Sequence, residues 1–417
     1  MIFKKSFMNK SLSGKKILLY LGYFLIIAIV LNNVLLYRLC ALSLFIGCIL
    51  LGKKEKELIN PYYLFSLCPL TLSLYYSFTD VYMMELKEKT WLLCVLNIYA
   101  FMLALYKTQP FLKKNNCIGV TNKASLHKHA FVCFALSFLG NVIEPLSAVL
   151  WIFSVPAIVC CVKSKDRLMY GVIVVYMGLV IASGTASKTG LLMNLITIMV
   201  AYSKYFDWRK NVRQLVLLGT AAVFLMFLSF TVFTIKGRET GNQEGMMTYY
   251  QKMGGFEWNY VAALFLPYMY LETPWSNVEY VVETQDTRTY GLWMLRPLLG
   301  YVGLKDRFEK SYHLESKSSF NTFTFITVGF KDFGVWLSVV PTLFLGFFVK
   351  KMYTRYLISR SPYDVACWAT VALATFQMYF SNHFYMQSYP FTCFIVLEIY
   401  KRVSMAMGDK VIEVEKV

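Results

Sequence analysis

The chain has 417 residues, a hydrophobic content of 57% and a mean hydropathy of +0.49, and only 16% of its residues are charged. This composition is too apolar for a soluble domain of this length, and it predicts a polytopic membrane protein. The formal net charge of +18 does not indicate nucleic acid, because no basic stripe interleaved with exposed aromatic residues occurs outside the predicted membrane loops. The cations instead lie next to predicted helix ends, where the positive-inside rule places them on the cytoplasmic side.

The first half of the chain predicts eight membrane spans. The run from 130 to 162 is too long for one crossing, and Glu144 and Pro145 break it into a hairpin. Lysine clusters at 53–57 and 113–128 mark inner loops. The first apolar run lacks a small-residue cleavage pattern, so it predicts a retained span. The eight spans are 17–33, 34–52, 61–79, 90–108, two within 130–162, 168–183 and 189–203.

The second half predicts a ninth span at 214–235, a long polar stretch at 236–332, and three further spans at 333–349, 363–382 and 386–400. We therefore expect an all-α fold of about twelve transmembrane helices with both termini cytoplasmic. Residues 236–332 then form one large extracytoplasmic loop. No internal repeat divides the sequence, so residues 1–417 predict a single transmembrane domain.

Two apolar segments interrupt the predicted outer loop, 258–271 and 291–304. Each is too short to span a membrane and is rich in Trp and Tyr, which predicts short helices in the headgroup layer. Arg296 lies in the second segment and would sit at the depth of lipid phosphates. A guanidinium fork matches phosphate oxygens and stays charged at working pH.

Several other charged residues leave two interpretations open. Arg38, inside the second predicted span, is either a snorkelling side chain or a functional charge. Glu144 is a surface loop residue or lines a headgroup cavity. Lys188, at a predicted helix start, is part of a plain turn or of an anion site. His313 is a surface residue or a general base.

Metal and cofactor chemistry have no support in the sequence. The 10 cysteines form no CxxC pair, and many lie within apolar runs, which indicates small core residues. No HExxH, DxD or GxSxG motif occurs, and no phosphate-binding loop is present. We therefore expect neither a bound metal nor a cofactor.

One group of motifs indicates a family. These are SFNTFTFITVGFKDFGVW at 319–336, the small-residue turn SGTASKTG, the loop opening KGRE and the segment YVAALFLPY. Over residues 180 to 400 the arrangement resembles the Wzy-type polymerases of O-antigen and oligosaccharide repeat units, which are integral membrane proteins of bacterial envelopes.

The resemblance implies that a growing glycan is transferred from undecaprenyl diphosphate onto the next lipid-linked repeat unit, at the outer face of the cytoplasmic membrane. Donor and acceptor lipids, membrane lipid and a chain-length regulator protein are the implied partners. Outer-loop arginines of the family hold diphosphates, a role that falls here on Arg238, Arg288 and Arg296. Lys188 stands where members often carry arginine, and it offers a point charge without the bidentate fork.

The chemistry also needs a base for the acceptor hydroxyl, and His313, Glu272 and Asp332 are the candidates. Asp332 has a second interpretation as the cap of a helix beginning at Phe333. A lipid-linked oligosaccharide flippase is the main alternative function, although transporters usually show repeated halves and short loops. An O-antigen ligase is a further alternative. Ligases carry a histidine motif near the place where this chain has Phe320 and Asn321, which favours the polymerase.

Overall fold

The computed structural model describes most of the chain, and helices dominate the part that it describes. The described residues are 13–55, 57–75, 84–107, 117–118, 123–143, 150–182, 188–206, 220, 258–285, 287–301, 303–304, 307–308, 322–359, 361–381, 384, 389–406 and 411–412. The chain forms two compact units. Unit 1 comprises 1–109, 272–350 and 378–381, and unit 2 comprises 110–271, 351–377 and 382–417.

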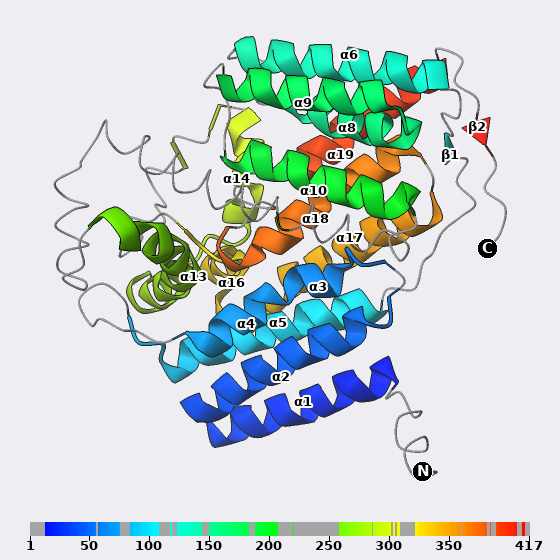
Figure 1. Ribbon diagram of the computed structural model, residues 1–417. Helices are drawn as coiled ribbons and strands as arrows, with labels where there is room; N and C mark the ends of the chain where they lie inside the picture. Colours follow the sequence, from blue (N-terminus) through cyan, green and yellow to red (C-terminus); the bar gives the residue numbers. More distant parts are fainter. Residues whose placement is uncertain are drawn as a thin grey trace, which may run out of the picture. The chain divides into compact units, whose positions relative to one another are not determined.

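Unit 1 begins with helices that lie side by side (Figure 1). They are α1 (Gly14–Leu31), α2 (Val34–Gly52), α3 (Pro61–Phe65), α4 (Leu67–Leu74) and α5 (Glu88–Lys107). Within the described residues, α1, α2 and α5 are the three helices long and apolar enough to cross a membrane.

The outer surface of these helices is strongly apolar. Val30 is 74% exposed and Leu35 is 64% exposed, and most neighbouring exposed side chains on α1 and α2 are also large and apolar. A soluble monomer rarely exposes a continuous apolar surface of this kind. The apolar helices therefore indicate a membrane-embedded protein.

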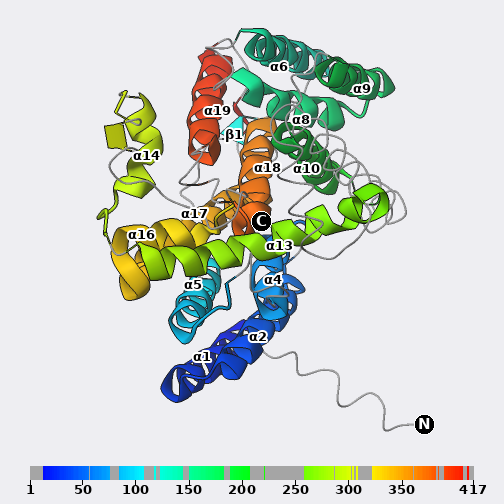
Figure 2. The same ribbon diagram turned by 90° about the vertical axis from the view of Figure 1, so that its left-hand side faces the viewer.

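The second part of unit 1 comes from the C-terminal half of the chain. It includes the end of α13 (Trp258–Thr284), α14 (Leu292–Tyr301), α16 (Phe325–Leu337) and the start of α17 (Val339–Ile358). Helix α16 packs against both α5 and α14 (Figure 2).

Aromatic and polar contacts hold α5 to α16 and α17. The Phe101 ring lies 6.1 Å from the Phe325 ring, centroid to centroid. The buried Asn97 amide donates to Ser338 Oγ at 2.9 Å and accepts from Thr342 Oγ1 at 2.6 Å. A buried amide in an apolar span is costly unless both of its ends are hydrogen-bonded, and here they are.

Unit 2 is a bundle of antiparallel helices whose charged ends meet at one end of the unit. Its elements are β1 (Cys117–Ile118), α6 (Lys123–Val142), η1 (Trp151–Phe153), α8 (Ser154–Ser164), α9 (Arg167–Ala182), α10 (Lys188–Tyr205), the first part of α13, the end of α17, α18 (Pro362–Phe376), α19 (Tyr389–Ala406) and β2 (Val411–Ile412). The 3-10 turn η2 (Gln377–Tyr379) follows α18. Strands β1 and β2 pair in antiparallel register, a contact that the sequence does not predict.

Several predicted boundaries are confirmed and others are wrong. Helix α2 covers 34–52 as predicted, because Asn33 caps its first turn by accepting from the amides of Leu35 and Leu36. The apolar segment at 258–271 is not a short interfacial helix, because α13 continues without a break to Thr284. The span predicted at 333–349 is divided between α16, which begins at Phe325, and α17.

The predicted span at 214–235 lies almost entirely outside the described residues, as does Glu144. The count of about twelve spans, the single domain and the large outer loop therefore stay predictions.

Candidate functional site

The most distinctive charged side chain of unit 1 is Arg288, in the short segment between α13 and α14. Its guanidinium carbon lies 4.4 Å from the centre of the Phe330 ring. Its Nη1 donates to the carbonyls of Gln285 and Phe330, both at 3.5 Å, which is long for a hydrogen bond. Among the described residues no carboxylate pairs with this half-exposed guanidinium. The ring therefore positions Arg288 without neutralising its charge.

Backbone hydrogen bonds hold the Arg288 segment against α16. The amides of Thr289 and Tyr290 donate to the carbonyls of Lys331 and Asp332 at 3.3 and 3.2 Å. Tyr290 and Gly291 both have positive φ, +49° and +96°, and they turn the chain into α14. Only a few non-glycine residues adopt this conformation, so the turn is a constrained one.

Asp332 anchors the start of α14. Its buried Oδ1 accepts from Thr289 Oγ1 at 2.5 Å and from the Trp293 amide at 3.1 Å. Its Oδ2 accepts from the Met294 amide at 3.0 Å. Burial raises the pKa of Asp332, and the hydrogen bonds from Thr289, Trp293 and Met294 oppose that rise. The carboxylate satisfies amides that a helix N-terminus leaves without an intrahelical partner.

The predicted cap at Phe333 is therefore wrong, although a capping role for Asp332 is right. Helix α16 begins at Phe325, so Asp332 lies within it and not before its first turn. Its side chain is directed to a neighbouring helix instead. The alternative role of Asp332 as a base stays a prediction.

Lys89 contacts the same ring as Arg288, and Lys331 follows Phe330 in the chain and reaches the Arg288 segment. Lys89, in the first turn of α5, places Nζ 6.0 Å from the Phe330 ring centre. Lys331 is buried, and its Nζ donates to Thr287 Oγ1 at 3.1 Å. We call Lys89, Arg288, Phe330 and Lys331 the Phe330 cluster. Sequence reasoning missed Lys89, because nothing in its own neighbourhood indicates that α5 packs against α16.

Arg296 lies on α14, next to the Phe330 cluster along the chain. Its guanidinium carbon is 5.6 Å from the Trp293 ring centre. Leu295 and Leu298 on the same helix are exposed. An exposed leucine row beside an arginine is typical of a helix in the headgroup layer.

The other predicted site residues are less informative. Glu272 is buried on α13, where the neighbouring Thr273 hydroxyl lies 3.1 Å from that of Thr322. Lys188 begins α10, but its side chain lies outside the described part. Arg238 and His313 lie outside the described residues altogether.

Arg38 lies outside the Phe330 cluster, and its two interpretations stay predictions. Its Nη2 donates to the Tyr75 carbonyl at 2.8 Å, and its guanidinium carbon lies 5.8 Å from the Trp91 ring centre. Tyr75 is the residue that follows α4. The cation therefore binds a carbonyl at a helix C-terminus, where the macrodipole favours positive charge.

Unit 2 also contains an arginine with little exposure, but carboxylates surround it. Arg355 Nε lies 2.5 Å from Asp364 Oδ1, and Arg355 Nη2 lies 2.8 Å from Glu398 Oε2. Asp364 is buried. The three residues come from α17, α18 and α19, so the ion pairs fasten three helices together.

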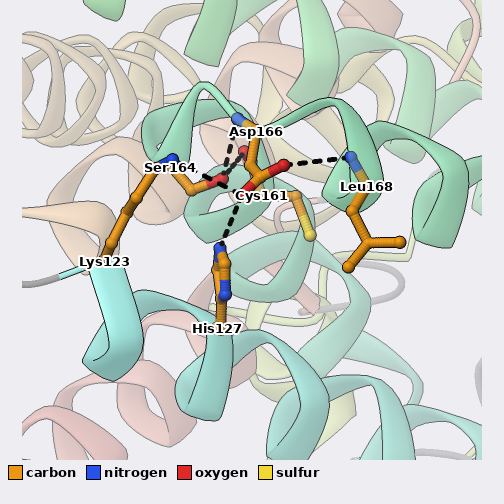
Figure 3. A network of polar contacts seen from close by, with 6 residues as sticks. All are labelled: Lys123, His127, Cys161, Ser164, Asp166 and Leu168. Atoms are coloured by element: carbon orange, nitrogen blue, oxygen red, sulfur yellow. Dashed lines mark hydrogen bonds and ion pairs between the residues drawn. The ribbon is translucent and has the colours of Figure 1, made fainter.

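A second charged network lies between α8 and α9 (Figure 3). Asp166 Oδ1 accepts from the Leu168 amide at 3.1 Å and so caps α9. Its Oδ2 lies 3.4 Å from Lys123 Nζ and 3.6 Å from His127 Nε2, both on α6. The Leu168 amide and the Lys123 ammonium hold the pKa of Asp166 below its usual range. Each charge here has a structural partner, so the network fastens α6 to α9.

No protein family, no curated protein and no solved structure matches this chain. Function must therefore be argued from the site itself. The Phe330 cluster is the strongest candidate, because it gathers three cations and Arg288 has no carboxylate partner among the described residues.

Proposed function

We propose that the chain is a membrane glycosyltransferase that polymerises lipid-linked oligosaccharides. It transfers a growing glycan from undecaprenyl diphosphate onto the next lipid-linked repeat unit, at the outer face of the cytoplasmic membrane. Arg288 carries the proposal, since its guanidinium is fixed on Phe330 and no described carboxylate neutralises it. A diphosphate supplies the bidentate oxygens that such a guanidinium binds.

The position of the cluster supports an outer site. At the opposite end of unit 1, Lys350 pairs with Glu55 at 2.8 Å, next to the lysines that end α2. Those lysines are the ones that the positive-inside rule assigns to the cytoplasm. The start of α5, and with it the Phe330 cluster, then belongs on the other side.

The chemistry requires few groups. The glycosidic bond between the sugar and the diphosphate breaks, and the acceptor hydroxyl oxygen forms the new bond while its proton passes to a base. Arg288 and Arg296 stabilise the charge that develops on the departing diphosphate. Asp332 is occupied by α14, so we assign it to positioning and keep Glu272 and His313 as candidate bases.

The test is polymerisation by purified protein in nanodiscs that contain an undecaprenyl diphosphate oligosaccharide. We expect a ladder of products, and we expect Arg288→Ala to lower its rate at least about tenfold, since a charge-assisted hydrogen bond is worth about 1.5–3 kcal/mol. Arg288→Lys should retain part of the rate. Lys350→Ala is the matched control, because Lys350 pairs with Glu55 away from the Phe330 cluster.

A wild-type protein that yields no ladder, or an Arg288→Ala variant that yields a normal one, would contradict the proposal. Deletion in cells distinguishes the flippase. A polymerase mutant should still place single repeat units on the carrier lipid or lipid A, whereas loss of even the single unit would indicate a transporter.

A further inference from the structure

Lys89 and Arg288 lie on the same aromatic ring although they are far apart in the sequence. Lys89 Nζ is 6.0 Å from the Phe330 centroid and Arg288 Cζ is 4.4 Å from it. The distance between the two charged groups is therefore no larger than the sum of these two distances. Two phosphate groups joined by one bridging oxygen can contact cations at such a separation.

The local charges leave Lys89 without a neutralising partner among the described residues. Glu283 forms an ion pair with Lys87, two positions earlier. Glu279 is buried and accepts from the Lys87 amide at 3.0 Å. The carboxylates that α13 directs toward this turn are thus both used by Lys87, and Lys89 stays exposed.

The place of Lys89 in a helix also matters. It lies in the first turn of α5, where the helix macrodipole disfavours a cation. An anion bound beside it would offset that cost and would also meet Arg288. Lys331 differs from both cations, because its buried ammonium donates to Thr287.

We propose that Arg288 and Lys89 each bind one phosphate of a polyprenyl diphosphate, so that Lys89 makes the site distinguish the diphosphate from a polyprenyl monophosphate. This inference rests on the proposed function. Arg288, with its planar fork fixed by Phe330, supplies affinity for either lipid. Lys89 reaches the phosphate that only the diphosphate carries, and it acts there as a point charge.

The test measures the binding of undecaprenyl diphosphate and undecaprenyl monophosphate to the full-length protein in nanodiscs. Wild type should prefer the diphosphate by about tenfold, the equivalent of one charge-assisted contact. Lys89→Ala should lose that preference by weakening the diphosphate alone, and Lys89→Arg should restore it. Arg288→Ala should weaken both lipids. Lys350→Ala should change neither, because Lys350 pairs with Glu55 away from the Phe330 cluster, and thermal unfolding of each variant checks the fold.

The outcomes separate this inference from the proposed function. If Lys89→Ala keeps the full preference for the diphosphate, or weakens the binding of both lipids equally, Lys89 does not bind the second phosphate. The proposed role of Arg288 is unaffected by either result. If wild type binds neither lipid, both proposals fail together. If wild type binds both lipids with equal affinity while Arg288→Ala weakens both, only the discrimination by Lys89 is overturned.

Discussion

Arg288 in unit 1 and Arg355 in unit 2 are both arginines with restricted exposure, and they differ in what surrounds them. Arg355 contacts Asp364 and Glu398. Arg288 contacts a phenylalanine ring and two carbonyls. Two carboxylates neutralise Arg355, whereas no carboxylate in the described part of the chain pairs with Arg288.

The difference arises from where the nearby carboxylates are directed. In unit 2 two carboxylates turn toward the guanidinium. In unit 1 Asp332, on the same helix as Phe330, gives its oxygens to Thr289 and the start of α14 instead. A guanidinium left in this state is suited to an anionic ligand, and one like Arg355 is suited to holding helices together.

The largest expected effect is on stability. Arg355→Ala leaves Asp364 buried without its partner and should lower the free energy of unfolding by about 3–5 kcal/mol. Arg288→Ala removes mainly a cation–π contact and should cost about 1 kcal/mol or less. Unfolding by heat or denaturant in detergent measures both. Equal losses for the two variants would break the comparison.

Removal of the Asp332 carboxylate should have the next largest effect. Asp332→Asn keeps one acceptor oxygen but opposes the Met294 amide with an NH₂ group, so we expect a loss of about 1–3 kcal/mol. Proteolysis near α14 should also become faster. If Asp332 instead served to neutralise Arg288, the variant would bind polyprenyl diphosphate more tightly without any change near α14.

Replacement of Arg355, Asp364 and Glu398 together should lower the free energy of unfolding less than replacement of Arg355 alone. In Arg355→Met, Asp364→Leu and Glu398→Met combined, no buried charge remains unpaired, and the free energy of unfolding should return to within about 1–2 kcal/mol of wild type. Unfolding of the triple variant beside Arg355→Ala is the measurement. A triple variant as unstable as the single one would show that the fold requires the ions themselves.

The smallest expected effect is on pH dependence. The pKa of Asp332 is raised in the folded state, so the folded state holds this proton more tightly than the unfolded chain does. Its contribution to stability is therefore fully present below the unfolded-state pKa of about 4 and is lost as the pH rises through the folded-state value. Unfolding measured between pH 4 and 7 should show this slope in wild type and not in Asp332→Asn, and equal slopes would contradict it.

Local signals predicted much of the helical fold. The apolar length of 34–52 predicted the bounds of α2, and the structure adds that Asn33 caps its first turn. The break between α6 and α8 follows from a run too long for one span. The length of α13 was missed, because the polar residues after 271 resemble a loop in the sequence although they pack within unit 1.

The candidate site was predictable only in part. The family resemblance pointed to Arg288, and residue type pointed to Asp332 as a helix cap, since aspartate suits helix starts. Which helix Asp332 caps, and which lysine faces Arg288, depend on contacts between segments far apart in the chain. Patterns among neighbouring residues do not predict such long-range contacts.

Gly334 has a consequence for relatives of this chain. Its φ of +75° and ψ of −168° interrupt α16, and this combination is open almost solely to glycine. Its Cα also faces the guanidinium, since a Cβ there would lie 3.5 Å from Arg288 Nε. We expect position 334 to remain glycine in any relative that keeps this interruption of α16, because the backbone conformation requires it.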